Sequence, residues 1–183
     1  MSGILHAQKL PSPGQTAADP EFHTDFYRPY AAAAHTALLM LCTARRDLQA
    51  LTGCDSVRAL TFRLKTPASI RGKLQKKGLP LTAAAAGAAL SDVAGLRAVL
   101  EDEESVYRFA DLLRTSPVAQ CFAEHDYIAF PKASGYRSLH LLMLIPVYAR
   151  TGALMVPAEI QLRTAVMDAW ASAEHAIVYK PCK

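Results

Sequence analysis

The chain has 183 residues, of which 51% are hydrophobic and 20% charged, and its formal net charge at pH 7 is +4. This length fits one domain with its own hydrophobic core. No apolar run approaches the roughly 20 residues that cross a bilayer, and the four cysteines lack the spacing of a zinc site or a compact disulfide framework. A membrane-spanning chain and a disulfide-built secreted protein are therefore excluded, and we expect a cytoplasmic protein.

The first segment, residues 1–21, has neither the basic start nor the apolar core of a secretory signal. It carries three prolines and two glycines, and we expect a flexible arm there. A single domain is expected over residues 22–183.

The predicted elements of this domain mix helices and strands. Apolar residues at helical spacing predict a long amphipathic helix over 22–52, with Gly53 as its stop. Alternation predicts a strand over 57–65. The other expected elements are helices over 69–77, 82–90 and 101–113, strands over 92–100, before Tyr127, over 138–148 and over 155–163, a turn at Thr151-Gly152, and a helix over 165–179. Its apolar stripe is expected to pack on the sheet; the stripe comprises Val166, Ala169, Trp170, Ala173 and Ile177.

A strongly basic stretch runs from Ser56 to Ser91, which has seven cations and no Asp or Glu. The cations are Arg58, Arg63, Lys65, Arg71, Lys73, Lys76 and Lys77. Helical spacing puts Ser69, Lys73, Lys76 and Lys77 on one face. Unpaired cations repel one another, and an anion such as a polyphosphate or a nucleic-acid backbone relieves that repulsion. A solvated basic helix face is the alternative.

Two carboxylates stand out against this basic background. Asp92 is the first acid after the basic stretch and begins a predicted strand. It can hold a divalent cation that bridges phosphates, because such a cation takes one or two carboxylates plus phosphate oxygens; a simple turn residue is the alternative. On the strand over 155–163, alternation places Glu159, Gln161 and Arg163 together on the polar face.

A tight loop is predicted between the apolar runs that end at Phe130 and begin at Leu139. Its Pro131 fixes a backbone angle, and its Gly135 permits one that other residues avoid. The loop and its end carry two cations, an aromatic ring and an imidazole, namely Lys132, Arg137, Tyr136 and His140. This set suits a base held by stacking and phosphates held by charge-assisted hydrogen bonds. A basic hairpin turn is the alternative.

Five motifs in order resemble the synthetase domain of the RelA/SpoT proteins, above all the single-domain small alarmone synthetases. They are KTPASIRGKL, DVAGLRAV, DYIAFPKASGYRSLH, EIQLRTAVMDAWASAEH and the closing YK, and they span about residues 26–180. The resemblance implies an α+β, nucleotidyltransferase-like fold with a mixed sheet of about five strands flanked by helices. It also implies transfer of pyrophosphate from ATP to the ribose 3′-hydroxyl of GDP or GTP, which yields ppGpp or pppGpp and AMP.

The resemblance also implies roles for the residues that bind the ATP donor. Arg63 and Arg97 correspond to arginines that sandwich adenine. The residues that correspond to the ATP-phosphate group are Lys65, Ser69, Lys73 and Lys76. Asp92 corresponds to the Mg²⁺ ligand, and Glu159 to the acid that binds metal or activates the 3′-hydroxyl.

On the acceptor side, Tyr136 corresponds to the tyrosine that stacks on guanine, with Lys132 and His140 near the acceptor phosphates. Stacking alone does not select a base. We expect Asp168, in the helix that flanks Tyr136, to accept hydrogen bonds from guanine N1 and N2 and so to favour guanine over adenine.

Departures from the family leave alternatives open. The chain stops near Tyr179-Lys180, where many small synthetases continue with helices that assemble a tetramer, so a homo-oligomer is possible but a tetramer is not expected. No hydrolase segment is present. Relatives that act as toxins make adenosine alarmones or modify the 3′ end of tRNA, and a non-catalytic nucleotide- or RNA-binding module is a third reading. No stable nucleic-acid partner is expected outside the toxin reading.

Overall fold

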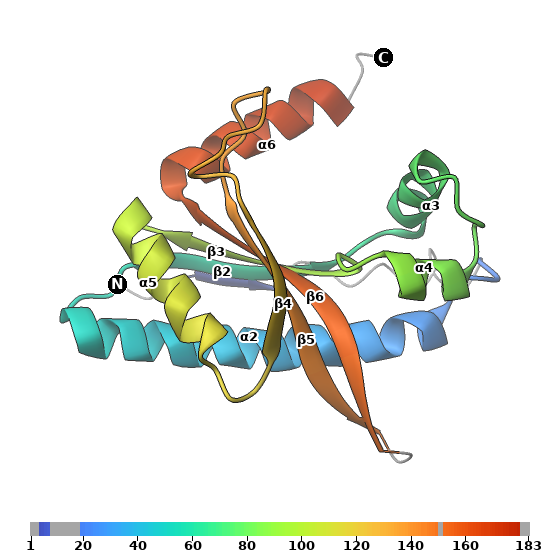
Figure 1. Ribbon diagram of the computed structural model, residues 1–183, viewed down its shortest axis with the longest axis horizontal. Coiled ribbons are helices and arrows are strands. Elements are labelled where there is room, and N and C mark those ends of the chain that lie inside the picture. The colour runs from blue at the N-terminus through green and yellow to red at the C-terminus, as the bar shows by residue number, and fades with distance from the viewer. Residues whose placement is uncertain (1–3, 8–18, 150–151, 180–183) are drawn as a thin grey trace.

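A mixed sheet with strand order β1-β2-β3-β6-β5-β4 organises the fold (Figure 1). The computed structural model describes residues 4–7, 19–149 and 152–179. The strands are β1 (Ile4–Ala7), β2 (Val57–Leu64), β3 (Ala94–Leu100), β4 (Gln120–Asp126), β5 (Leu139–Ala149) and β6 (Gly152–Thr164). The helices are α2 (Thr24–Thr52), α3 (Pro67–Lys76), α4 (Ala83–Ala89), α5 (Glu103–Arg114) and α6 (Ala165–Tyr179). The predicted α+β class and the order of its elements are confirmed.

The sheet has one strand more than the five expected. Strand β1 lies within the segment that we expected to be a flexible arm, and it pairs in parallel with β2. Its residues carry no hairpin or turn signal that points to β2, so only the folded sheet edge reveals the pairing. Residues 1–3 and 8–18 of the arm, Thr151 of the expected turn, and Lys180 of the last motif lie outside the described residues.

The two faces of the sheet differ in what they carry. Helix α2 runs along one face, where it contacts β2, β3, β5 and β6, and α5 packs beside it (Figure 1). On β6, Ala158, Ile160 and Leu162 are fully buried, whereas Glu159 and Gln161 alternate with them and turn to the opposite face. That opposite face lies below α6 and carries the polar residues of the predicted site.

The described side chains of the apolar stripe predicted for α6 are exposed and do not pack on the sheet; they are Val166, Ala169, Trp170 and Ala173. Val166 is 79% exposed and Trp170 39% exposed, while Met167 and Ala171 are buried instead. The reason is that Asp168, on the inward side of the helix, is bound by arginines of the sheet, and a rotation that buried Val166 would break these ion pairs.

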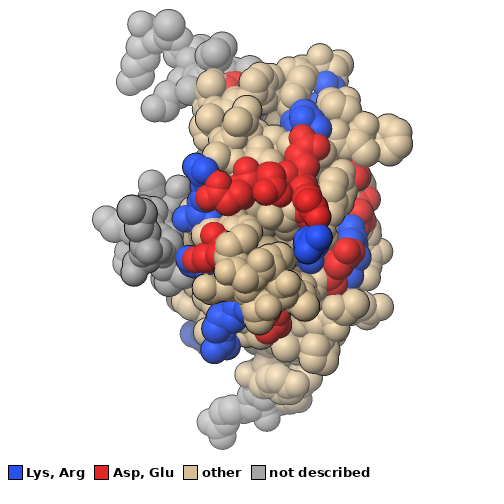
Figure 2. Space-filling model, turned by 90° about the vertical axis from the view of Figure 1, so that its left-hand side faces the viewer, with Lys and Arg blue, Asp and Glu red and all other residues tan. Residues whose placement is uncertain are grey.

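The basic stretch from Ser56 to Ser91 is better neutralised than its sequence indicates. Among the described residues, at least four of its seven cations form ion pairs: Arg58 with Glu101, Lys65 and Lys73 with Asp92, and Arg71 with Asp19. Acidic and basic side chains also lie close together on the face shown in Figure 2. Asp92 directly follows the stretch, whereas Asp19 and Glu101 come from other parts of the chain, and a count of charge within the stretch misses all three. No described helix is both long and apolar enough to cross a bilayer.

Candidate active site

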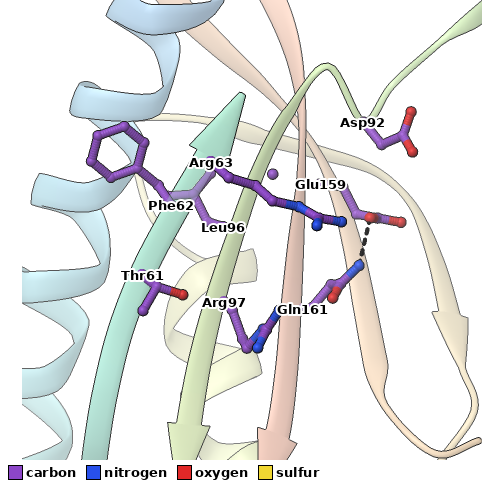
Figure 3. A pocket seen from close by; sticks show the side chains of 9 residues that line it. Thr61, Phe62, Arg63, Asp92, Leu96, Arg97, Glu159 and Gln161 are labelled. Atoms are coloured by element: carbon purple, nitrogen blue, oxygen red, sulfur yellow. Dashed lines mark hydrogen bonds between the residues drawn. The ribbon is translucent and has the colours of Figure 1, made fainter. Parts of the chain in front are cut away.

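A pocket opens between β2, β3 and β6, on the sheet face that α2 does not cover (Figure 3). Its charged lining residues are Arg63, Asp92, Arg97 and Glu159, so the structure brings both predicted carboxylates together with both predicted adenine-binding arginines. The strand register explains this. Arg63 lies opposite Gly95, and Gly95 lies opposite Glu159. Because Gly95 has no side chain, it leaves space between the guanidinium and the carboxylate.

Asp92 lies just before β3 and is held by two lysines. Its Oδ2 accepts hydrogen bonds from Lys65 Nζ and Lys73 Nζ, each at 2.8 Å. Burial raises the pKa of Asp92, but the two lysines outweigh it and leave the pKa below its ordinary value. Its Oδ1 is buried and has no hydrogen-bond partner. The two oxygens of this carboxylate therefore differ, because the lysines bind Oδ2 alone.

Glu159 is held from two sides. Its Oε1 lies 3.0 Å from His140 Nδ1, and its Oε2 accepts a hydrogen bond from Gln161 Nε2 at 2.8 Å. Burial raises the pKa of Glu159, yet the hydrogen bond with His140, together with the one from Gln161, lowers it below its ordinary value. These contacts favour the ionised form of a carboxylate that is largely buried.

His140 does not reach outward as expected for a phosphate ligand. It is 7% exposed, and both of its ring nitrogens face protein groups. Nδ1 contacts Glu159, and Nε2 lies 2.8 Å from the hydroxyl of Tyr136. His140 and Tyr136 therefore lie side by side as predicted. Instead of facing outward toward a phosphate, His140 connects the Tyr136 hydroxyl to the carboxylate of Glu159.

The loop that carries Tyr136 is shaped by a backbone turn and braced from both sides. Gly135 has φ 82°, and a Cβ at this position would meet the Trp170 ring at 3.4 Å. Lys132 Nζ lies 4.3 Å from the ring centroid of Tyr127 and 4.8 Å from that of Tyr136. Helix α6 thus flanks Tyr136 as predicted, and Lys132 is an exposed cation over the Tyr136 ring.

The other loop cation, Arg137, is directed away from Tyr136. Its guanidinium forms an ion pair with Glu103 at the start of α5, at 2.9 Å. Tyr107, also on α5, donates a hydrogen bond to Asp126 at the other end of the loop, at 3.0 Å. These contacts anchor the base of the loop to α5, so Arg137 has a structural role.

Asp168 links the two halves of the predicted site. Its Oδ1 accepts from Arg97 Nη1 at 2.9 Å and from Arg163 Nη1 at 3.1 Å. Burial lowers the pKa of Arg97, and the charge of Asp168 partly offsets this. The carboxylate expected to read guanine thus also binds an arginine expected to stack on adenine, a contact that no sequence motif indicates.

Arg163 was not assigned a role from the sequence, although it was placed on the polar face of its strand. It is buried, and it donates to Tyr136, Gln161 and Asp168. Arg163 lies two residues after Gln161 and four after Glu159, so alternation puts all three on one face of the strand. This spacing was the signal in the sequence that could have indicated a role for Arg163.

The remaining predicted donor residues, Ser69 and Lys76, lie on α3, the helix that also carries Lys73. Ser69 is exposed near the start of the helix, where its backbone N–H donates to the Thr66 hydroxyl, and Lys76 is exposed in the last turn. The buried residues Ile70 and Leu74 hold the opposite face of α3 against the core. The predicted division of this helix into a basic face and an apolar face is confirmed.

A metal ion at this site would have few protein ligands. Among the described residues, no group of three or more His, Cys, Asp or Glu side chains is arranged to hold a metal. Asp92 and Glu159 nevertheless line one pocket, and the buried Oδ1 of Asp92 lacks a partner. Two carboxylates fit a divalent cation that takes its other ligands from phosphates and water.

The fold and the pocket together define an α+β domain with a two-carboxylate site on the open face of its mixed sheet. Residues 62–183 match the family described as the region found in RelA / SpoT proteins, and the chain belongs to that family. It is 35% identical over 135 residues to the GTP pyrophosphokinase YwaC of Bacillus subtilis, and 36% identical over 124 residues to the GTP pyrophosphokinase YjbM of the same organism. These matches cover 74% and 68% of this chain, and 64% and 57% of the respective relatives.

Solved structures show the same likeness. The small alarmone synthetase 1 of Bacillus subtilis bound to its product pppGpp superposes with a TM-score of 0.77 at 32% identity, over 85% of this chain and 78% of that one. The same protein bound to AMPCPP superposes with a TM-score of 0.69 at 25% identity, over 85% and 77%. The recognition made from the five motifs is confirmed.

Proposed function

We propose that this protein is a (p)ppGpp synthetase, which transfers pyrophosphate from ATP to the ribose 3′-hydroxyl of GDP or GTP and releases AMP. The observation that carries the proposal is the pocket in which Asp92 and Glu159 lie with Arg63 and Arg97, next to the loop of Tyr136. Membership of the family supports it, as do relatives named GTP pyrophosphokinases. We also expect the enzyme to work in the cytoplasm, where these nucleotides are made.

The donor half of the site is suited to ATP. Arg63 and Arg97 present planar guanidinium groups that can stack on adenine. Lys65 and Lys73 form ion pairs with Asp92, and we propose that they bind the triphosphate together with Ser69 and Lys76. We propose Mg²⁺ at Asp92 and Glu159, where it would neutralise the charge that develops on the phosphate oxygens.

In the proposed reaction, the 3′-oxygen of the acceptor attacks the β-phosphorus of ATP. The new bond joins that oxygen to the β-phosphorus. The bond from the β-phosphorus to the oxygen that bridges it to the α-phosphorus breaks, and AMP leaves with that oxygen. Glu159 is held ionised by His140 and Gln161 and is the group available to take the hydroxyl proton. Stacking of both bases would hold the reacting atoms in line.

For the acceptor, we propose that Tyr136 stacks on the base and that Lys132 binds the 5′-phosphates. His140 borders this half and holds Tyr136 and Glu159 in place. Asp168 is proposed to accept from guanine through Oδ2, because its Oδ1 already receives two arginines. This assignment makes guanine the preferred base, since a site built for its hydrogen bonds rejects adenine.

The test is to incubate the protein with ATP, Mg²⁺ and one acceptor at a time, and to quantify AMP by chromatography. The acceptors are GDP, GTP, ADP and deacylated tRNA, with no acceptor as the control. We expect AMP release with GDP or GTP and no more than background with the others. AMP release that is faster with tRNA or ADP than with GDP or GTP would show that the enzyme uses a different acceptor. Absence of AMP release with all four acceptors would indicate a binding module.

A further inference from the structure

We propose that Arg163 is the positioning residue of the acceptor half. It holds the hydroxyl of Tyr136 and sets the direction of the hydrogen bonds that reach Glu159 from both sides. This inference rests on the proposed function, because it concerns how the same site is kept ready for an acceptor.

All three nitrogens of the Arg163 guanidinium have protein partners. Its side chain is 6% exposed. Nε donates to the hydroxyl of Ser138 at 3.3 Å and Nη1 to Asp168 at 3.1 Å. Nη2 donates both to the Tyr136 hydroxyl at 2.6 Å and to Gln161 Oε1 at 2.8 Å. A buried guanidinium used in this way fixes the groups around it, because moving any one of them leaves a buried donor unpaired.

These contacts close a ring of five side chains. From Arg163 one arm runs through Tyr136 and His140 to Glu159, and the other runs through Gln161 to the same carboxylate. Every link of the ring is 3.0 Å or shorter. The ring therefore connects the residue proposed to stack the acceptor base with the residue proposed to take its proton.

Arg163 gives both arms a direction, because a guanidinium only donates. Gln161 accepts through its carbonyl oxygen and must turn its amide nitrogen to Glu159 Oε2. The Tyr136 hydroxyl accepts from Arg163, so with a neutral His140 it has its own proton to donate to Nε2. His140 then carries its proton on Nδ1 and donates to Glu159 Oε1. Both arms thus end as donors to the carboxylate, which favours its ionised form.

A lysine at this position cannot reproduce the arrangement. Its ammonium is a single point of charge at the end of a flexible stem, whereas the contacts of Arg163 need a planar fork. Arg163→Lys should keep at most one of the two hydrogen bonds that residue 163 donates to Tyr136 and Gln161, and Arg163→Met should lose both. Arg114→Lys and Arg114→Met are the matched controls, since Arg114 bonds Glu124 and Asp111 away from the pocket.

The first measurement uses ligand-free protein labelled with ¹³Cζ-tyrosine. Of the seven tyrosine signals, the one that Tyr136→Phe removes belongs to Tyr136. We expect Arg163→Lys and Arg163→Met to move this signal and the Arg114 variants to leave it in place. An unmoved signal in both Arg163 variants overturns the inference, whether or not the protein turns over nucleotides. If the signal moves but wild-type protein releases no AMP, the arrangement stands and the proposed function fails.

The second measurement separates kcat from KM for each substrate. We expect Arg163→Lys to raise the acceptor KM and lower kcat, each on the order of 10-fold, with the ATP KM changed less than about 3-fold. Tyr136→Phe removes only the hydroxyl and should raise the acceptor KM similarly. Combining it with Arg163→Lys should add little, since both break the same link. The positioning role is refuted if the increases in acceptor KM from Arg163→Lys and Tyr136→Phe multiply in the double variant. It is also refuted if Arg163→Lys changes the acceptor KM no more than Arg114→Lys does.

Should Arg163→Met fail to fold, Arg163→Lys and Tyr136→Phe still decide the matter. The lone tryptophan of the chain, Trp170, packs against the loop at Gly135, so its fluorescence also reports acceptor binding without turnover. A GDP titration by this signal should show weaker binding for both variants. Unchanged affinity in both variants contradicts the inference.

Discussion

Replacement of Glu159 by glutamine is the perturbation whose outcome the structure defines most sharply. Glutamine keeps the shape of the side chain, and its carbonyl oxygen can still accept from Gln161 Nε2. Its amide nitrogen would face His140 Nδ1, which accepts when the imidazole proton moves to Nε2. The Tyr136 hydroxyl then receives two donors and is left with an unused proton. We estimate the cost to folding as about 1 kcal/mol, because the buried hydroxyl proton of Tyr136 is left without an acceptor.

The cost to catalysis should be much larger. Loss of a positioned base lowers rates by about 10²-fold to 10⁴-fold, equivalent to about 2.7 to 5.4 kcal/mol of transition-state stabilisation. Glu159→Gln should therefore reduce AMP release with ATP and GDP by at least about 100-fold, while the melting temperature falls by only about 2 to 4 °C. The assay is the initial rate of AMP formation, with thermal unfolding measured on the same preparations.

Glu124→Gln is the matched control, because Glu124 forms an ion pair with Arg114 outside the pocket. It should retain activity within about 2-fold while losing a similar, small amount of stability. Activity of Glu159→Gln within 10-fold of wild type would refute the assignment of Glu159 as base or metal ligand. A loss of activity that merely follows a large fall in melting temperature would refute it as well.

Three further predictions concern the two halves of the site. Arg63→Ala and Arg97→Ala should each raise the ATP KM by about 10-fold or more and the GDP KM much less, since each stacking contact is worth roughly 1 to 3 kcal/mol; steady-state kinetics with an increase confined to GDP would reverse the donor and acceptor halves. Asp92→Asn should abolish Mg²⁺-dependent turnover and also change acid stability. Because the folded pKa of Asp92 is lowered, its contribution to stability is present above the ordinary pKa of 3.8 and is lost as the pH falls through the folded value. Asp92→Asn should therefore lose less stability than wild type below pH 3.8. Acid unfolding measures this, and a profile identical to that of wild type contradicts the prediction. Tyr136→Ala should weaken every acceptor, whereas Asp168→Ala should narrow the preference for GDP over ADP; an unaltered preference would show that Asp168 acts only on the arginines.

The sequence by itself determined the features that depend on near neighbours along the chain. Helical spacing located α2 and the inward face of α3, and alternation on β6 put Glu159, Gln161 and Arg163 on one face. The turn at Gly135 followed from the backbone freedom of glycine. The five motifs identified the family, because a fixed order of short chemical patterns is far more specific than any one of them.

The tertiary structure decided which distant residues meet. The acids that pair with the basic stretch, Asp19, Asp92 and Glu101, lie outside it, so a count within the stretch predicted an unpaired cluster where the fold forms ion pairs. The outward face of α6 depends on Asp168 meeting sheet arginines, an interaction that outweighs the burial of Val166. Likewise, Arg137 turns to Glu103 and His140 turns inward, because their partners come from other elements. Periodicity describes one element at a time, whereas an ion pair or hydrogen bond between elements depends on their packing and register, which a single sequence does not encode locally.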